Sequence, residues 1–584
     1  MNLITFNIDD KLLDNKHQSI VTTKKNLLFS HAYQINKYFQ KKNKYKIALP
    51  FDLDKNKNQL KKLKLIDKTY KILMEDLCKI LNKAHNKNFD QKYWEILIGK
   101  WLKTFVYQMF TNWEILAKIE KKYKIKSFSK IALDDNIFIP ENTSHSHSLI
   151  RTVNYKYNLF HHWTITKMIE HKNRIKINSL ELKQGLNIKK KISKLNKPIK
   201  YESMYHKSFD KKIFYYRWDV PRKIKIEIMK YFKFLNLRIR EENLEELSSK
   251  YFDRNLIFKN KYKYKNFNSF LNNIIKFTFP KIFLEKYSIL EEKYKKLNWP
   301  KNPKYILTTF PYYDEVFKFY CAQNYTLGSK TIITQHGQDN IYQYDDWFVN
   351  KIFKYQLSWG GNKKKGLKNF IFTKNYQDQK AKFKFKKDNK ILLILYSFSE
   401  TEDRMPDGYL DNYSINKIIY SNTIEYLKNL KKNLLIKNDI KALQLTRFPI
   451  LKNSIKKKYK NIKFMGLEKP FNKVIFDYNL SIHFFIGTPF FESIYLNRPT
   501  IVIFDPRVNL RFDKKFKSFL KKFRENQLCF DNPNDAAKFI NKNYDNLNEW
   551  WNLPKRQKIL DEFCNFFCRR SEVLQEEFDY INKI

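Results

Sequence analysis

From residue 302 onward, short apolar runs alternate with segments of helical periodicity, and this alternation restricts the fold more than any other feature of the sequence. A strand that is apolar along its whole length is buried on both faces, as in parallel sheets covered by helices. The alternation therefore predicts an α/β fold built from strand–helix–strand units. The apolar runs are YILTTF, TIITQ, ILLILY, ALQLT, NIKFM, LSIHFFIG and TIVIF.

A charged stretch of low complexity, KNYQDQKAKFKFKKDNK at residues 374–390, separates two groups of these runs and is typical of an interdomain linker. We therefore expect an N-terminal domain at residues 1–380, a C-terminal Rossmann-like domain at 381–545 and C-terminal helices at 546–584. Apolar residues at three- and four-residue intervals indicate that roughly 60–300 is mainly helical. Its aromatic residues, Tyr93, Trp94 and Trp101, suit either a core or a glycan platform, and helical spacing favours the core.

The formal net charge of +55 would ordinarily indicate nucleic acid or an anionic membrane as a partner. The lysines are spread along the whole chain, however, together with abundant Asn, Ile, Tyr and Phe, a mixture typical of an AT-rich genome. We therefore interpret most of the charge as a diffuse surface coat and expect no nucleic-acid partner. Some attraction to anionic lipid head groups or nucleotide donors remains.

The five cysteines are few and mostly scattered, which favours a reducing compartment. Cys564 and Cys568 lie one helical turn apart among phenylalanines, which predicts a buried helix face rather than half of a metal site. The first residues, MNLITFNIDDKLL, do not have the pattern of a signal peptide, and no window of about 18 apolar residues could span a membrane. We expect a cytoplasmic protein, at most peripheral to the cytoplasmic face of the inner membrane.

Ligands bind doubly wound sheets outside the carboxyl ends of the strands, so the residues after each apolar run are candidates for a site. After YILTTF, Asp314 and Glu315 fall in the first turn of a helix, where a carboxylate could act as a general base or simply complement the helix dipole. After TIITQ come His336 and Gly337. The imidazole could bind an anion, carry a proton or be structural, and the glycine would permit a left-handed backbone and close approach of a ligand.

The second group of runs offers residues suited to a phosphate. Ser397 follows ILLILY and could meet a phosphate or only cap a helix, and Arg447 follows ALQLT and could bind a phosphate or form a surface ion pair. In GTPFFESIYLNRPTIVIF, Gly487 allows a tight turn, Thr488 is the expected N-cap, and Glu492 lies one position too late for a capping box. The carboxylate of Glu492 would then be available to sugar hydroxyls while the helix N-terminus holds phosphate.

No G-x-x-x-x-G-K-[ST], G-x-G-x-x-G, H-E-x-x-H or G-x-S-x-G motif occurs in the sequence. FDLD at 51–54 has the D-x-D form of some metal-dependent transferases, but any short acidic turn has the same form. SHSHS at 144–148 and HHW at 161–163 lack carboxylates or cysteines at metal-ligand spacing. We expect no metal site and no cofactor.

Taken together, these segments resemble a family of bacterial transferases of O-antigen and surface-polysaccharide biosynthesis, distantly similar to capsule Kdo transferases through the QHG segment. The resemblance implies a GT-B-like glycosyltransferase, with two Rossmann-like domains facing across a cleft, helical insertions in the N-terminal domain and C-terminal helices that cross back to it. The chain departs from the family after QHG, where a second glycine is expected, and at His483, where small or acidic residues are common. The similar stretches, in order from about residue 70 to 555, are LNKAHNKNFDQKYWEILIGKWL, TIITQHG, GTPFFESIYLNRPTI, NPNDAAKFI and DNLNEWW.

The resemblance also implies the reaction. A nucleotide sugar, with a CMP-linked ulosonate such as Kdo as one candidate, would give its sugar to a glycan or lipid-linked acceptor of lipopolysaccharide or capsule, with inversion and without an obligatory metal. His336, Asp314 or Glu315 would be the catalytic base. The implied donor-binding residues are Ser397, Arg447, Gly487, Thr488 and Glu492, and the residues expected near the cleft are Gln335, Gly337 and Asp339.

Two other classes of function stay open at the level of sequence. A basic nucleic-acid-binding protein would carry its lysines as a clustered stripe on one face and bind with a steep salt dependence. A non-catalytic GT-B-like scaffold would keep the fold without binding a nucleotide. The sequence does not predict an oligomeric state.

Overall fold

The computed structural model describes part of the chain, and the described residues form three parallel β-sheets with helices packed on them. The predicted α/β class with parallel sheets is therefore confirmed. The described residues are 1–5, 26–29, 46–48, 59–151, 155–180, 213–217, 249–259, 266–297, 299–309, 314–337, 341, 352–353, 355–360, 368–369, 383–387, 390–396, 412–442, 455–459, 462–466, 470–508 and 512–568.

The first sheet has the strand order β3-β2-β1-β4-β5 and was not predicted from the sequence. Its strands are short and mix polar with apolar residues, as in SFSKI and KINSL, so they do not stand out beside the long helices around them. Its strands are β1 (Asn2–Ile4), β2 (Asn26–Phe29), β3 (Lys46–Ala48), β4 (Ser127–Ile131) and β5 (Lys176–Leu180). The helices in this part of the chain are α3 (Gln59–His85), α4 (Gln91–Tyr123), η2 (Asp135–Phe138), α5 (Thr143–Arg151) and α6 (Tyr155–Lys172).

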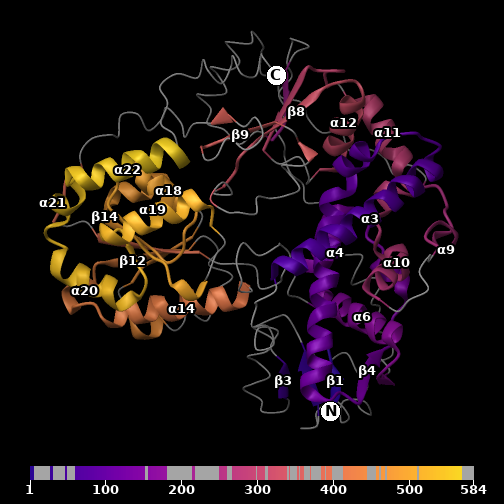
Figure 1. The fold of residues 1–584 in the computed structure, drawn as a ribbon, viewed down its shortest axis with the longest axis horizontal. Helices are drawn as coiled ribbons and strands as arrows, with labels where there is room; N and C mark the ends of the chain where they lie inside the picture. Colours follow the sequence, from indigo (N-terminus) through magenta and orange to yellow (C-terminus); the bar gives the residue numbers. More distant parts are fainter. Residues whose placement is uncertain are drawn as a thin grey trace.

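The second sheet has the order β10-β9-β8-β7-β6, so its strands follow one another without a reversal of direction along the sheet. Figure 1 shows helices α11 and α12 beside this sheet, next to the long helices α3 and α4. The strands are β6 (Ile213–Tyr215), β7 (Tyr305–Thr308), β8 (Lys330–Thr334), β9 (Tyr355–Ser358) and β10 (Lys368–Asn369). The helices are α9 (Arg254–Ile257), α10 (Phe267–Thr278), η3 (Lys281–Phe283), α11 (Tyr287–Lys296) and α12 (Glu315–Thr326).

The third sheet has the order β13-β12-β11-β14-β15-β16 and forms the lobe drawn in orange and yellow in Figure 1. Helices α14 and α20 lie on one side of this sheet, and α18, α19 and α22 lie on the other. The strands are β11 (Lys390–Leu395), β12 (Asn438–Ala442), β13 (Phe464–Met465), β14 (Tyr478–His483), β15 (Thr500–Ile503) and β16 (Cys529–Phe530). The helices are α14 (Asn412–Lys428), α15 (Lys432–Leu435), α17 (Phe471–Val474), η7 (Ile475–Asp477), α18 (Thr488–Tyr495), η8 (Pro506–Val508), α19 (Lys514–Glu525), α20 (Pro533–Asn543), α21 (Leu547–Asn552) and α22 (Pro554–Phe567).

Six of the seven apolar runs contain a strand, but the prediction for ALQLT is wrong in position. Strand β12 ends at Ala442, the residue at which the predicted strand begins. Polar residues concealed this strand, although they are buried and bonded in the fold. Asp439 accepts a hydrogen bond from the hydroxyl of Tyr478 at 3.0 Å, and Lys441 donates to the carbonyl of Gly466 at 2.6 Å.

The second sheet is buried on both faces, because neighbouring residues along its strands belong to two different cores. Phe214, Ile306 and Ile333 join the core formed with α4, α12 and the first sheet. Ile213, Leu307 and Ile332 join the core that continues into the third sheet and the C-terminal helices. This two-sided burial is the physical reason for the uniformly apolar runs that identify β7 and β8 in the sequence.

The aromatic segment of α4 forms part of a core, as helical spacing predicted. Trp94 is fully buried, and its indole donates to Asn82 at 2.9 Å. The hydroxyl of Tyr93 lies 2.7 Å from that of Tyr287, and the indole of Trp101 donates to Ser146 at 3.0 Å. These side chains hold α3, α5 and α11 against α4.

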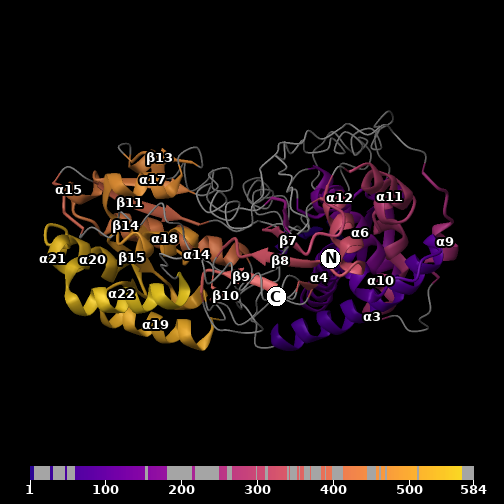
Figure 2. The ribbon, with the colours of Figure 1, turned by 90° about the horizontal axis from the view of Figure 1, so that it is seen from above.

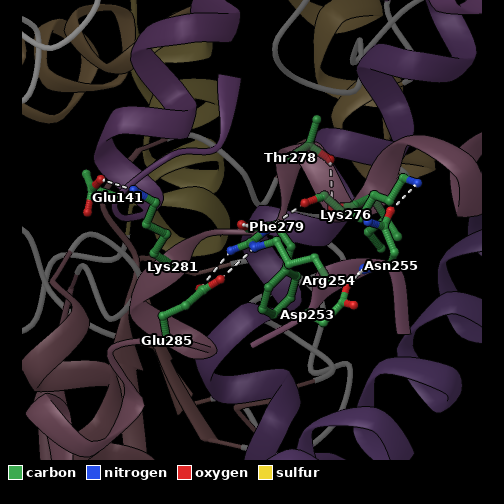
Figure 3. Close-up of polar contacts among 10 residues, drawn as sticks. Glu141, Asp253, Arg254, Asn255, Lys276, Thr278, Phe279, Lys281 and Glu285 are labelled. Atoms are coloured by element: carbon green, nitrogen blue, oxygen red, sulfur yellow. Dashed lines mark hydrogen bonds and ion pairs between the residues drawn. The ribbon is translucent and has the colours of Figure 1, made fainter. Parts of the chain in front are cut away.

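Arg254 fastens the small helix α9 to α10 and to the chain after η3 (Figure 3). Its guanidinium pairs with both carboxylate oxygens of Glu285, at 2.6 and 2.8 Å, and donates to the carbonyls of Lys276 and Phe279 at the end of α10. A bidentate ion pair combined with bonds to the terminal carbonyls of a helix uses nearly all the donors of the guanidinium. This arginine therefore has a structural role.

Other expectations from the sequence are met by the C-terminal lobe and by the helices. Cys564 and Cys568 are both fully buried at the C-terminal end of α22, as the interleaved phenylalanines predicted. In the ranges described, no helix combines the length and apolarity needed to cross a membrane. Most of the predicted linker at 374–390 and the FDLD motif at 51–54 lie outside the described residues.

The second sheet contacts the C-terminal lobe directly. Gly360, two residues after β9, has a left-handed φ of +146°, and a side chain there would overlap the carbonyl oxygen of Phe566 near the end of α22. The amide of Asp513, which caps α19, donates to the carbonyl of Ile341 at 2.8 Å. Both α19 and α22 therefore touch the part of the chain that follows β8 and β9.

Replacing Gly360 with alanine should weaken this contact. The new Cβ would be strained by the backbone and would collide with the main chain of α22, which predicts a loss of roughly 1–3 kcal/mol in the free energy of unfolding. Gly328→Ala is the matched control, because Gly328 also has a positive φ, +92°, but open space around its Cβ position. Urea unfolding that shows equal losses for the two variants would contradict a tight contact at Gly360.

Candidate active site

The order of strands in the third sheet places a ligand crevice between β11 and β14. From β11 the chain proceeds to β12 and β13 on one side, whereas β14, β15 and β16 extend the sheet on the other side. Such a topological switch point leaves an opening outside the carboxyl ends of the two central strands. The residues that follow β11 and β14 therefore form the floor of the candidate site.

Gly487 follows β14 and lies against the ring of Tyr396, which follows β11. A Cβ at position 487 would stand 3.1 and 3.3 Å from two carbons of that ring. The backbone of Gly487 is extended, with φ −131° and ψ −179°, so its own conformation does not require glycine. The ring of Tyr396 also stacks on Phe485, with centroids 5.3 Å apart. Close approach of this ring therefore explains the glycine, and the sequence analysis did not single out Tyr396.

The predicted cap of α18 is wrong by one residue. The N-cap is Gly487 rather than Thr488, so Thr488 is the first helical residue and Pro489 the second. Glycine has no side chain with which to cap a helix, and among the described residues no side-chain bond caps this one. The first turn of α18 thus points its amides and the positive end of the helix dipole into the crevice.

Glu492 lies four residues after Thr488, one helical turn further along the same side of α18. Its side chain is partly buried, and the loss of water around the carboxyl raises the pKa of Glu492 to about 7. In the described part of the chain, its carboxylate has no hydrogen-bond or ion-pair partner. A partly buried carboxyl with unused hydrogen-bonding capacity is suited to a polar ligand.

The segment after β8 is held by the side chain of Gln335. This side chain is 4% exposed; its oxygen accepts from the amide of Trp359 at 2.9 Å, and its nitrogen donates to the carbonyl of Gly337. His336 between them is exposed. Gly337 does not have a positive φ, so the expected left-handed backbone is wrong, and the turn is held by the amide of Gln335 instead.

The segment after β8 meets the start of α18. A Cβ on Gly337 would lie 3.7 Å from the hydroxyl oxygen of Thr488, which is ordinary contact distance. The second and third sheets therefore direct their carboxyl-end segments toward one another at this point. This contact agrees with the predicted pair of Rossmann-like units facing each other across a site, and it brings two predicted parts of the site together.

Asp314 and Glu315 stand at the start of α12, and both carboxylates have partners within the protein. Asp314 is the N-cap: it accepts from the amide of Phe317 at 3.0 Å and from the hydroxyl of Tyr216. Glu315 accepts from the amide of Thr143 at 2.8 Å and lies 3.8 Å from the ammonium of the buried Lys318. Glu315 thereby ties α12 to the start of α5.

Other predicted residues do not join the described site. Ser397, Arg447 and Asp339 lie outside the described residues. His483 is buried in β14 beside the hydroxyls of Ser481 and Ser493, at 3.1 and 3.3 Å, and burial lowers the pKa of His483 to about 3.

The histidine motifs in the N-terminal part do not form a metal centre in the described ranges, where no three His, Cys, Asp or Glu side chains are grouped to hold an ion. The ring of His162 lies at the switch point of the first sheet, between β1 and β4. Its nitrogens lie 2.8 Å from the hydroxyl of Thr5 and 2.9 Å from the amide of Ile131. Burial lowers the pKa of His162 to about 3, as expected for a neutral histidine that joins two strands.

Comparisons with known proteins identify a family. The model of the family described as LIC12162 family transferase matches residues 11–579. No curated protein sequence matches the chain.

Several solved structures are similar to about half of the chain. They include MurG of Acinetobacter baumannii (12% identity, 52% of this chain and 79% of MurG, TM-score 0.29) and WaaG, a glycosyltransferase involved in lipopolysaccharide biosynthesis (10% identity, 51% and 81%, TM-score 0.26). Anabaena Alr3699/HepE in complex with UDP and glucose is another (8% identity, 54% and 89%, TM-score 0.31). At this level of similarity the superpositions do not assign a function.

Contact between Gly487 and Tyr396 should appear as an energetic coupling. Gly487→Ala forces the Tyr396 ring away from Phe485, which predicts a loss of about 1 kcal/mol in the free energy of unfolding. In a Tyr396→Ala background the same substitution should cost almost nothing, because the obstacle is gone. A double-mutant cycle by urea unfolding measures this coupling, and additive losses would contradict the contact.

Glu492 should make stability depend on pH. Its folded pKa, about 7, is above the ordinary value of 4.5, so folding favours the protonated form and wild-type stability falls as pH rises through this window. Glu492→Gln removes this dependence and should gain on the order of 1–3 kcal/mol relative to wild type between the two ends of the window. Unfolding curves that stay parallel for the two proteins across this pH range would contradict the burial of the carboxyl.

Proposed function

The chain belongs to the LIC12162 family of transferases, and from this premise we propose that it is a GT-B-like glycosyltransferase that moves a sugar from a nucleotide donor to a glycan or lipid-linked acceptor. The observation that carries the proposal is the meeting of Gly337 with Thr488. It places an exposed histidine after one parallel sheet opposite an uncapped helix start after another. A donor bound on the third sheet would thus have its reacting carbon directed toward residues of the second.

The donor is assigned to the crevice between β11 and β14. The first-turn amides of α18 receive the phosphates, because the helix dipole and the absence of a side-chain cap favour an anion there. Glu492, one turn further on, accepts hydrogen bonds from hydroxyls of the ribose or the sugar. Tyr396 offers an aromatic edge beside Gly487, and Arg447 and Ser397 are proposed to complete the phosphate contacts.

The catalytic base is assigned to His336. It is exposed at the carboxyl end of β8, next to the segment that touches Thr488, whereas the carboxylates of Asp314 and Glu315 already accept hydrogen bonds within the protein. Asp314 and Glu315 are the alternative bases, and Asp339 is a further carboxylate near the cleft. Gln335 positions the histidine through its bonds to Gly337 and Trp359.

The reaction follows from these assignments. The base takes the proton of the acceptor hydroxyl as its oxygen attacks the anomeric carbon, and the carbon–oxygen bond to the phosphate breaks with inversion. The departing phosphate keeps the bonding electron pair, and the amides and dipole of α18 stabilise its charge. Because the helix supplies this stabilisation, we expect activity without an added metal.

The acceptor and donor classes come from the sequence resemblance. We propose a role in lipopolysaccharide, O-antigen or capsule biosynthesis, with a CMP-linked ulosonate such as Kdo as the first donor to test. A lipid-linked acceptor would require peripheral contact with the inner membrane.

The direct test is a panel of nucleotide sugars incubated with the purified protein in the presence of a chelator. We expect one donor class to be hydrolysed slowly, or transferred when an acceptor is supplied, because water can replace the acceptor hydroxyl. Isothermal titration with CMP and UDP measures donor binding independently of turnover. Absence of nucleotide binding by a folded protein would overturn the proposal in favour of a scaffold.

Variants separate the proposed roles. His336→Ala should lower kcat by about 10²–10⁴-fold, the usual contribution of a general base, and leave donor affinity unchanged. Glu492→Gln should weaken donor binding roughly 10- to 100-fold, because a charged hydrogen-bond acceptor is lost. His147→Ala and Glu549→Gln, which change the same residue types away from the site, serve as controls. Full activity of both site variants would refute the site assignment.

A further inference from the structure

The outer side of α19 is unusually basic. Six of its twelve residues are lysine or arginine, and Glu525 is its one acidic residue. By contrast, α14 and α20 on the opposite side of the third sheet each carry two lysines and one acidic residue. The basic residues of α19 are Lys514, Lys515, Lys517, Lys521, Lys522 and Arg524.

Packing fixes the direction of these charges. Phe516, Phe519 and Phe523 are buried, and their rings contact Phe563 of α22 at centroid distances of 5.2–6.1 Å. The helix cannot rotate without exposing this aromatic side. Lys514, Lys517 and Lys521, at intervals of three and four residues, therefore form an exposed stripe on its opposite side.

The neighbouring helix α22 extends the charged area. Figures 1 and 2 show α19 and α22 side by side on one side of the third sheet. Lys522 pairs with Glu562 of α22 at 2.6 Å, and this bond, with the nearby Lys558 and Lys515, lowers the pKa of Glu562. We call the exposed lysines of the two helices, Lys514, Lys515, Lys517, Lys521, Lys522 and Lys558, the basic face.

Only part of this charge is neutralised within the protein. Glu562 pairs with Lys522, Asp531 pairs with Arg524, and Glu525 lies 4.0 Å from Lys521. Lys514 and Lys517 have no ion-pair partner among the described residues. The basic face therefore keeps a positive charge that an external anion can meet.

The basic face lies beside the candidate active site. The cap of α19, Asp513, bonds to the carbonyl of Ile341, four residues after Gly337. Helix α18, whose start meets Gly337, is on the same side of the third sheet as α19 and α22. A surface bound to the basic face would thus come close to the segments that form the site.

We propose that the basic face docks the protein on an anionic lipid bilayer. Two helices side by side present lysines over a broad surface, which suits a plane of phosphate head groups, and each lysine near such a surface adds to the attraction. The apolar sides of both helices are used in the core, so docking is electrostatic and reversible rather than an insertion. The inference deepens the proposed function, because it would bring the site to a lipid-linked acceptor.

The test is sedimentation of the full chain with vesicles of phosphatidylcholine, with and without phosphatidylglycerol. We expect binding only to the anionic vesicles, weakening as salt is added. Replacing the stripe, Lys514→Gln with Lys517→Gln and Lys521→Gln, should weaken binding on the order of 100-fold. The matched control removes the same charge from an exposed stripe on α3, by Lys64→Gln, Lys68→Gln and Lys71→Gln, and should bind almost as wild type does.

Two further arms keep the result decisive. The same three positions changed to arginine should restore vesicle binding, and circular dichroism should show that all variants are folded. Equal losses in the α19 and α3 variants would overturn the proposal, because binding would then come from a diffuse charge coat. Duplex DNA bound through the stripe, without vesicle binding, would overturn it in favour of nucleic acid. Vesicle binding needs no donor, so its failure leaves the transferase assay unaffected.

Discussion

Burial of the second sheet on both faces is the constraint on which the rest of the structure depends. Neighbouring residues of β6, β7 and β8 serve two cores, one shared with the N-terminal helices and one shared with the C-terminal lobe. A shift of one residue in any of these strands would exchange the two sets of side chains. This constraint holds the register of β8, and with it the position at which Gln335, His336 and Gly337 leave the sheet.

Close contact of main chain with neighbouring atoms explains where this chain uses glycine. Only ten glycines occur in 584 residues, so each position needs a reason. At Gly487 the reason is the ring of Tyr396, and at Gly360 it is the carbonyl of Phe566. The first contact shapes the crevice between β11 and β14, and the second joins the second sheet to α22. Both depend on residues distant in sequence, so a local turn rule explains neither.

Sequence patterns predicted the α/β class, most strands after residue 302, and the meeting of the QHG and GTPFFE segments, because apolar periodicity and strand order are local properties. They missed the first sheet, whose strands are short and partly polar, and they misplaced β12, whose polar residues are bonded inside the fold. They also named Asp314 and Glu315 as candidate bases without seeing their partners. Tyr216 and Thr143 approach these carboxylates from distant parts of the chain.

The sequence by itself determined which segments are buried and which polar residues end the strands, because burial on two faces demands apolar residues at every position. Only the tertiary structure decided what each of those polar residues does. Glu492 has unused hydrogen-bonding capacity and a raised pKa because nothing described around it donates to its carboxylate, whereas Glu315 is occupied by the start of α5. The physical reason is that desolvation and hydrogen bonding depend on which distant groups packing brings within about 3 Å, and no local pattern encodes that distance.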